Sequence, residues 1–439
     1  MPPGRGFAYS SRTMSKLKGF SRAFWVANVI ELFERFAYYG SKAILAVFIA
    51  EQVGMGPTKA GFLVGSVFNM LLYFLPVLAG TVVDRYGFKK SLLACFSIFC
   101  IGYFLVGLGG LPAGKPIVDA MGAVPYMIFA LVVTAIGGSL IKPSIVGTVA
   151  RTTTAETKNL GYSIYYTLVN LGGAIGPILA LQVRQNIGIA YVLVMSSLVS
   201  LGLVVATLLF FKEPPRPADA APPKSMAGVV ADMFLVFRDL KFMSFLVIFS
   251  GFWTMFWHIF YALPFYVRDV LHFEKFEIIE TVDAWTIILV TVPAAALAKR
   301  LSAFTAMTLG FALASVSWFV MGAFPTIPMT VAAIVVFAIG EATQAPRYYG
   351  YVADLAPKEQ VGTYMGFAFL PVAIGTFIAG AISGPLVARY VGQRENDVFT
   401  PGPEFAHAPR MWFWVGAIGI ASTVGMVLYD RLVARRSAA

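Results

Sequence analysis

The sequence is poor in charge. Charged residues make up 13% of its 439 positions, about half of the roughly 25% typical of soluble domains. Hydrophobic residues make up 58%. A soluble core of this length cannot bury so much apolar surface, whereas a bilayer can, because lipid replaces water around the outer faces. The composition therefore excludes an ordinary soluble protein and predicts one embedded in a membrane.

The sequence has two cysteines and three histidines, so few side chains are available for metal binding or redox chemistry. Cys95 and Cys100 lie five positions apart in one apolar run, so on a helix they face different directions. This spacing indicates neither a disulfide nor a metal site. The sequence also lacks the HExxH and GxSxG motifs of metalloproteases and serine hydrolases. We expect no metal, no cofactor and no enzymatic activity.

Apolar runs of about 20 residues recur along the chain, and the alternation typical of barrel strands is missing. Each run must be helical, because a segment that crosses lipid has to pair its backbone polar groups within itself. The sequence therefore predicts an all-α membrane protein with twelve spans. The predicted spans are 22–50, 60–83, 91–111, 123–149, 160–183, 189–211, 242–267, 276–298, 302–323, 327–353, 362–389 and 411–432.

Basic residues favour alternate loops between these spans. Arg85, Lys89 and Lys90 follow the second span and Arg151 follows the fourth, so with twelve spans these loops share one side with both termini. A surplus of basic residues marks the cytoplasmic side. We therefore expect a multi-pass protein of the cell membrane with both termini in the cytoplasm. The net charge of +11 then reflects orientation, and no nucleic-acid partner is expected.

The longest polar stretch between spans runs from Lys212 to Lys241 and contains Pro214, Pro215 and Pro217. Proline at this density favours extended, unpacked chain. The stretch divides the sequence into halves of six spans, the organisation in which a central site is exposed alternately to each side of a membrane. The predicted domains are a cytoplasmic tail (1–21), an N-terminal six-helix bundle (22–211), a cytoplasmic linker (212–241), a C-terminal six-helix bundle (242–432) and a second tail (433–439).

The loop after the second span carries glycine, aspartate and basic residues at fixed spacing. It resembles the signature loop of the major facilitator superfamily, and the alternative is an ordinary basic loop. The resemblance implies a cytoplasmic gate, in which the aspartate caps a helix end and accepts a hydrogen bond from a basic partner across the bundle. The gating residues it implies are Gly80, Asp84, Arg85, Gly87, Lys89 and Lys90.

The first span carries charges inside an apolar helix. Glu31, Glu34, Arg35, Tyr38 and Lys42 follow a helical spacing that places them on one face. A charge at the bilayer centre costs about 2.5–3.5 kcal/mol, so this face must meet protein or water. Either the charges form a structural salt bridge between spans, or the paired carboxylates beside the arginine form a coupled proton site.

This run resembles the ExxERFxYY signature of the proton-dependent oligopeptide transporters. Further segments resemble that family in spans 2, 4, 5 and 10. These segments are Tyr73–Pro76, Gly137–Pro143, Tyr165–Gly173 and Gly340–Glu341. The resemblance implies the major-facilitator fold of two six-helix bundles.

The resemblance also implies roles for single residues. Glu31, Glu34 and Arg35 become the proton-coupling set. Arg35, Lys42 and Lys142 become a positive pocket for a substrate carboxylate, and Glu341 receives the amino group. A cavity with a cationic and an anionic wall orients a zwitterion. Lys142 and Glu341 have the alternative role of structural ion-pair partners. Tyr38, Tyr39, Tyr73 and Asn170 would hydrogen-bond the peptide backbone.

The sequence departs from the family in three places. In span 7 the usual carboxylate is replaced by Trp257, followed by His258, which is either a substitute proton-linked group or a neutral hydrogen-bonding residue. The central loop is short, although bacterial members commonly carry two extra helices there. Asp283 stands where asparagine is commoner, and Arg347 is an added base. We include these four residues among the site candidates.

We therefore expect a proton-coupled symporter that imports di- and tripeptides, or a similar small zwitterion, by alternating access. Its partners would be the solute, protons and the lipid bilayer, and we expect a monomer. One alternative is a transporter of another charged organic solute or anion, which fits the altered span 7. The other is a sensor that keeps the fold without transport.

Overall fold

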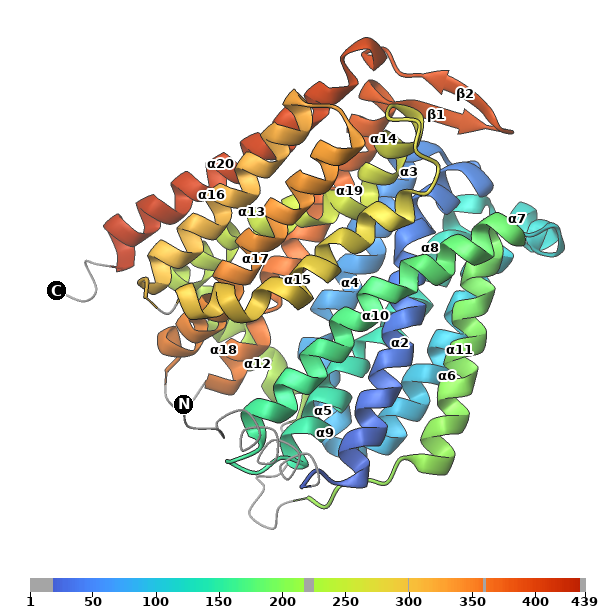
Figure 1. The fold of residues 1–439 in the computed structure, drawn as a ribbon. Coiled ribbons are helices and arrows are strands. Elements are labelled where there is room, and N and C mark those ends of the chain that lie inside the picture. The colour runs from blue at the N-terminus through green and yellow to red at the C-terminus, as the bar shows by residue number, and fades with distance from the viewer. Residues whose placement is uncertain (1–18, 217–224, 299, 358–360, 435–439) are drawn as a thin grey trace, which may run out of the picture.

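The computed structural model describes residues 19–216, 225–298, 300–357 and 361–434. Nearly all of this chain is helical, as Figure 1 shows. Most of the predicted N-terminal tail, part of the predicted linker and most of the C-terminal tail lie outside the described residues. The same is true of Lys299 and Lys358.

The first half of the chain forms the first bundle. Pro76 begins α5, where its missing N–H costs no helical hydrogen bond. Gly40 of α2 and Gly176 of α10 lie in close contact, since a Cβ on Gly40 would come 3.0 Å from the Gly176 carbonyl oxygen. The elements are α2 (Arg22–Val47), η1 (Phe48–Gln52), α3 (Gly56–Gly61), η2 (Phe62–Asn69), α4 (Met70–Phe74), α5 (Pro76–Tyr86), α6 (Phe88–Leu108), η3 (Pro112–Gly114), α7 (Lys115–Met121), α8 (Ala123–Ser139), α9 (Ile141–Arg151), α10 (Lys158–Asn186) and α11 (Ile189–Phe210).

The second half forms the second bundle and one small hairpin. The strands β1 and β2 pair antiparallel, with Gly392 opposite Pro401. Asn396 and Asp397 adopt positive φ between them, as two-residue hairpin turns require. The elements are α13 (Leu240–Tyr261), α14 (Leu263–Asp269), α15 (Phe276–Ala298), α16 (Ala303–Ala323), α17 (Ile327–Leu355), α18 (Val361–Phe367), α19 (Leu370–Tyr390), β1 (Gly392–Glu395), β2 (Val398–Pro401), η4 (Phe405–Arg410), α20 (Met411–Tyr429) and η5 (Asp430–Ala434).

Eleven helical segments among the described residues are long and apolar enough to cross a membrane. The remaining long helix, α2, carries too many charged residues to be recognised as a membrane span from its composition. It nevertheless packs against α10 and α11 inside the first bundle. Adding α2 to the eleven gives twelve spans, which confirms the predicted fold of two six-helix bundles.

The predicted linker is not extended throughout. Residues Met226–Arg238 form helix α12, which packs against α5, α13 and α18. Ser225 begins this helix by accepting a hydrogen bond from the Gly228 N–H at 3.1 Å. The prediction was wrong for this part because the prolines end before Ser225, and the apolar residues that follow have a surface to pack against.

The two ends of the molecule differ in how the bundles meet. We call the end that carries β1 and β2 the hairpin end, and the opposite end, where α2 begins, the termini end (Figure 1). Toward the hairpin end, Gly61 and Gly65 of the first bundle meet Gly380 and Gly384 of α19 so closely that no side chain would fit. Toward the termini end, a Cβ on Gly80 would meet nothing within 4 Å.

Candidate substrate-binding site

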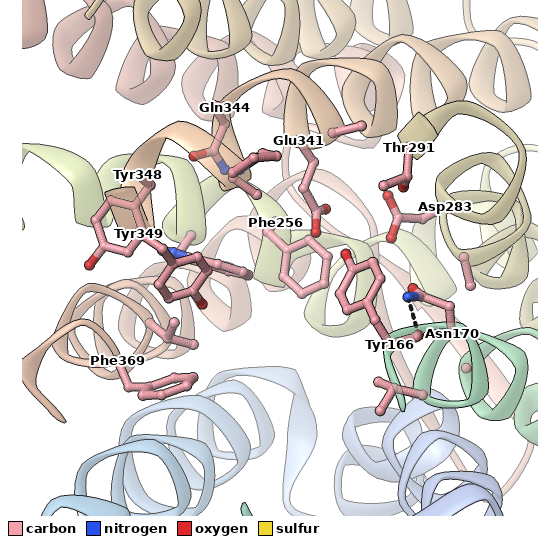
Figure 2. Close-up of a pocket in the computed structure, with 18 of the residues that line it drawn as sticks. Tyr166, Asn170, Phe256, Asp283, Thr291, Glu341, Gln344, Tyr348, Tyr349 and Phe369 are labelled. Carbon is pink, nitrogen blue, oxygen red and sulfur yellow. Dashed lines mark hydrogen bonds between the residues drawn. The ribbon is translucent and has the colours of Figure 1, made fainter. Parts of the chain in front are cut away.

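A cavity of about 520 Å³ lies between the two bundles. Figure 2 shows the carboxylates of Asp283 and Glu341 extending into the same space as Tyr166. On α13 the lining aromatics recur at helical spacing, so one face of this helix forms a wall. The described residues that line the cavity are Tyr39, Lys42, Tyr73, Tyr162, Ser163, Tyr166, Val169, Asn170, Gly173, Phe249, Trp253, Phe256, Phe260, Glu280, Asp283, Ala284, Thr291, Glu341, Ala342, Gln344, Ala345, Pro346, Tyr348, Tyr349, Phe369 and Val372.

Lys42 is the one basic side chain among the described residues that line this cavity. It is 4% exposed. Its Nζ lies 3.4 Å from the ring centroid of Phe260 and 4.2 Å from that of Trp257. It forms no ion pair with any carboxylate in the described part of the chain. The aromatic faces therefore hold the ammonium group by cation–π attraction and leave it available to an anion.

Three carboxylates face the cavity from the second bundle. Glu280 and Asp283 lie three residues apart on α15, hence on one face, and Glu341 lies on α17. Both oxygens of Glu280, one of Asp283 and one of Glu341 are buried without a hydrogen-bond partner among the described residues. All three act electrostatically on Lys42. The cavity is thus bipolar, with the base on one bundle and the acids on the other.

The other charges of span 1 are paired within the first bundle. Glu31 lies 3.1 Å from the Lys142 Nζ and 3.5 Å from the Arg35 Nε. Arg35 also pairs directly with Glu34. Tyr165 accepts a hydrogen bond from Lys142 at 2.8 Å. Two carboxylates therefore compensate two bases in one buried cluster.

This cluster adjoins the main cavity. Arg35 and Lys142 line a second, smaller pocket of about 40 Å³, which shares Tyr73 and Phe369 with the main cavity. The family resemblance implied one positive pocket made of Arg35, Lys42 and Lys142. The structure separates these residues, because Lys42 faces the main cavity and the other two are neutralised beside it.

The predicted hydrogen-bonding residues divide in the same way. Tyr39, Tyr73 and Asn170 line the main cavity, and Asn170 donates to the Tyr166 carbonyl at 2.9 Å (Figure 2). Tyr38 is 2% exposed and lines the smaller pocket. Its hydroxyl lies 3.1 Å from that of Tyr73, so it connects the two pockets.

The unusual residues of span 7 are buried away from the lining. Trp257 is fully buried and covers Lys42, and its ring stacks on Tyr261. His258 is also fully buried, with its Nδ1 2.7 Å from the Thr254 carbonyl oxygen and its Nε2 without a described partner. Neither residue is among those that line the cavity.

Arg347 lies at the termini end of α15. Its guanidinium donates to the carbonyl oxygens of Ala298 at 2.7 Å and Leu301 at 3.1 Å. A base at the last carbonyls of a helix satisfies acceptors that have no partner within the helix. The structure therefore places Arg347 at a helix end and outside the set of lining residues, whereas Asp283 and Glu341 both line the cavity.

The signature loop lies at the termini end. Gly87 has φ of +86° and joins α5 to α6. The Glu213 carboxylate accepts hydrogen bonds from the backbone N–H groups of Phe88 at 2.9 Å and Lys89 at 2.6 Å. Asp84 is exposed and forms no ion pair within the described chain. Glu213 was missed from the sequence, where it reads as part of the linker.

The remaining predicted gating residues lie around this turn. Gly80 lies on α5 with open space around it. The Arg85 guanidinium lies 5.7 Å from the Tyr86 ring, and the Lys89 Nζ donates to the Leu208 carbonyl at 3.0 Å. Lys90 is exposed on α6.

Ion pairs connect the bundles at the hairpin end. Arg184 of α10 pairs with Glu277 of α15 and donates to the Glu274 carbonyl at 2.8 Å. Arg268 of α14 donates to both carboxylate oxygens of Glu51, at 2.9 and 2.5 Å. These pairs join residues about 90 and 220 positions apart, so no local pattern reveals them. They hold the two bundles together at this end.

Sequence reasoning also missed Glu280. A carboxylate three residues before Asp283 in an apolar helix was the signal that would have found it, since an ionisable residue inside a span faces protein or water. Among the described residues, no group of three His, Cys, Asp or Glu side chains is arranged to hold a metal ion.

Comparisons with known proteins place the chain in a family. The sequence matches the Major Facilitator Superfamily over residues 28–281 and 276–437. It is 30% identical over 194 residues to dipeptide and tripeptide permease B of Edwardsiella piscicida, which is 43% of this chain and 36% of the relative. The corresponding permease of Salmonella typhimurium is 31% identical over the same shares. The match thus spans about a third of the length of these curated relatives.

Two further comparisons cover nearly the whole chain. An uncharacterized MFS-type transporter of Bacillus subtilis, YqjV, is 26% identical over 402 residues, 89% of this chain and 90% of the relative. A solved POT family transporter in complex with a thioalcohol-conjugated peptide shares the fold with a TM-score of 0.75. Its sequence is 17% identical, over 95% of this chain and 99% of that one. The chain therefore belongs to the major facilitator superfamily.

Proposed function

We propose that the protein is a proton-coupled symporter that imports di- and tripeptides, or a similar small zwitterion, into the cell. The observation that carries this proposal is the arrangement of Lys42 and Glu341, which face one cavity from different bundles. A zwitterion ends in opposite charges, so its carboxylate fits Lys42 and its amine fits Glu341. Binding would then draw on both bundles at once.

The cavity suits a solute of peptide size. Its volume of about 520 Å³ lies within the range of roughly 300–1,000 Å³ for small-molecule sites. The Trp253 Nε1 and the Gln344 Oε1 are buried in its wall without described partners. A peptide bond offers the complementary carbonyl and N–H groups. The names of the permeases that the sequence matches support the same substrate class.

Proton coupling is assigned to the cluster of Glu31, Glu34, Arg35 and Lys142. A proton on Glu31 removes the charge that compensates Lys142, and a proton on Glu34 does the same for Arg35. Each event leaves a base free beside the substrate cavity, which the smaller pocket adjoins. Groups this close titrate as a set. A substrate carboxylate that paired with the freed base would favour the protonated form of Glu31 or Glu34. Proton uptake would therefore depend on the substrate carboxylate.

The structure corresponds to one state of an alternating-access cycle. Ion pairs and glycine contacts close the hairpin end. Exposed lining residues, Ser163, Tyr166 and Tyr349, lie on the halves of α10 and α17 that point to the termini end. We assign the termini end to the cytoplasm from the surplus of basic residues there. This state would release substrate inward.

An anion transporter, the alternative within this fold, is disfavoured. Three carboxylates and one lysine among the described lining residues would repel a solute that carries only negative charge. A sensor on the same fold would bind the solute without moving it, so only a transport measurement separates the two.

Uptake into liposomes tests the proposal. The purified protein would be reconstituted and given an inward proton gradient with labelled dialanine outside. We expect accumulation above the external concentration, and its collapse when a protonophore is added. Protein-free liposomes are the control. Binding of dialanine without uptake would favour the sensor, and accumulation that ignores the protonophore would contradict proton coupling.

A further inference from the structure

The cavity contains more negative charge than a simple zwitterion uses. Among the described lining residues, Glu280, Asp283 and Glu341 oppose Lys42 alone. With one acid taken by the substrate amine and Lys42 by the substrate carboxylate, two carboxylates remain. Both of these, Glu280 and Asp283, lie on α15.

Neither of the two carboxylates is satisfied by the protein. Glu280 is 3% exposed and Asp283 is 9% exposed. Both oxygens of Glu280 and Oδ1 of Asp283 have no hydrogen-bond partner among the described residues. Burying an ionised carboxylate without a partner is costly, so such a group is paired, meets a cation or takes up a proton. Lys42 does not fill this role, since its ammonium group lies against Phe260 and Trp257.

Glu277, one turn earlier on the same helix, makes the contrast clear. It is fully buried like Glu280, yet Arg184 of the first bundle pairs with it. At this position the protein itself supplies a base, Arg184, that compensates the carboxylate of Glu277. One and two turns further, toward the cavity, no such base is supplied by the described residues. The missing partner is therefore expected to come with the solute.

We propose that Glu280 and Asp283 form a second cation subsite, which binds an ammonium or guanidinium group of the substrate in addition to the amine held by Glu341. The proposal rests on the proposed function and names its substrate class. The preferred solutes are peptides or similar zwitterions that carry one extra positive charge, such as a dipeptide with a lysine or arginine side chain.

An organic cation fits this subsite better than a metal ion. No three metal-binding side chains are grouped among the described residues. The cavity lining is rich in aromatic rings, including Tyr166 and Phe256 (Figure 2). Such rings accommodate the apolar stem of a lysine or arginine side chain while its charged end reaches a carboxylate.

Two dipeptides that differ mainly in charge test the proposal. Alanyl-lysine and alanyl-norleucine have side chains of similar length, and only the first is cationic. Their affinities for the purified full-length protein would be measured by calorimetry, together with dialanine and 1,4-diaminobutane. We expect alanyl-lysine to bind at least about tenfold more tightly than alanyl-norleucine, since a charged hydrogen bond exceeds one decade in affinity.

Two cavity variants test whether Glu280 and Asp283 cause the preference for alanyl-lysine over alanyl-norleucine. Glu280→Gln and Asp283→Asn should each reduce the ratio of the two affinities to within a few-fold. Asp119→Asn is the matched control, because this carboxylate lies on α7 with a side chain 60% exposed and pairs with Lys115. A preference retained in both cavity variants would overturn the assignment. The comparison of ligands on the native protein does not depend on whether the variants fold.

The outcomes also separate this proposal from the proposed function. Equal binding of alanyl-lysine and alanyl-norleucine by the native protein overturns the second subsite and leaves peptide transport intact. That result would also be expected if Glu280 and Asp283 held protons in place of a cation. Binding of 1,4-diaminobutane without any dipeptide would overturn peptide transport and support the subsite. Failure of all four compounds to bind would overturn both.

Discussion

The two bundles treat buried charge differently. In the first bundle, Glu31 and Glu34 are compensated by Arg35 and Lys142 within one cluster. In the second bundle, Glu280, Asp283 and Glu341 keep buried oxygens without partners among the described residues. When a carboxylate of a paired cluster takes up a proton, the base that it compensated is left without a partner. A carboxylate without a partner can instead bind a cation from the solute. We infer from this difference that the first bundle couples transport to protons and that the second bundle binds the substrate amine.

The largest expected effect comes from removing one proton site of the compensated cluster. Glu34→Gln cannot take up a proton, although it keeps the shape of the side chain beside Arg35. We expect proton-driven accumulation of dialanine to be abolished, while exchange of internal for external substrate stays measurable. Uptake and counterflow in the same liposomes check this. A variant that still concentrates substrate would show that the coupling site lies elsewhere.

The next effect compares stability between the bundles. Glu31→Gln leaves Lys142 without its carboxylate, and breaking a buried pair costs about 3–5 kcal/mol in soluble proteins. Glu280→Gln removes a carboxylate that has no partner in the described structure, so it should be neutral or stabilising. Thermal unfolding in detergent should therefore show a lowered midpoint for the first variant only. Equal destabilisation by both variants would contradict the view that carboxylates are compensated in the first bundle and not in the second.

A smaller effect is expected where the two bundles share a pair. Arg184→Gln uncouples α10 from the buried Glu277, so the closed hairpin end should lose stability. We expect a faster return to the state open at the hairpin end, seen as increased labelling of a cysteine introduced near the cavity. The exposed Lys115–Asp119 pair offers the control, since surface pairs contribute only about 0–1 kcal/mol and Lys115→Gln should change little. Unchanged labelling in Arg184→Gln would contradict a role in closure.

The smallest effect concerns the signature loop, which lies away from both sets of charges. Asp84 is exposed and unpaired within the described chain while the hairpin end is closed. We expect Asp84→Asn to slow turnover several-fold without changing the affinity for substrate, because its partner is met only when the termini end closes. Transport rates and equilibrium binding measured side by side check this. A loss of affinity with unchanged turnover would oppose it.

Much of the fold could be predicted because its signals are local. Apolar runs marked the spans, and helical spacing placed Glu31, Arg35 and Lys42 on one face of α2. The partners of these residues could not be predicted, since pairing depends on how each helix is rotated against its neighbours. Two roles therefore stayed open for Lys142, substrate ligand or ion-pair partner, and the structure pairs it with Glu31. Glu280 carried a local signal, its spacing from Asp283, but its lack of a partner among the described residues could not be predicted, because its neighbours come from distant parts of the chain.

The resemblance of single motifs had a similar limit. It led to the interpretation of Arg347 and Trp257 as pocket residues, since both depart from the family pattern inside or beside a span. The structure instead places Arg347 on the last carbonyls around α15 and Trp257 over Lys42. The helix α12 was also missed, because the prolines before it dominated the composition of the linker.

The central claim is that a carboxylate of the second bundle holds the substrate amine while Lys42 holds its carboxylate. Four affinities test it, those of dialanine and N-acetyl-dialanine for the native protein and for Glu341→Gln. We expect each single change to weaken binding about tenfold or more, since a charged hydrogen bond of about 1.5–3 kcal/mol is lost. Both changes together should weaken binding little further, because they remove the same interaction. Losses that simply add would show that Glu341 does not contact the amine.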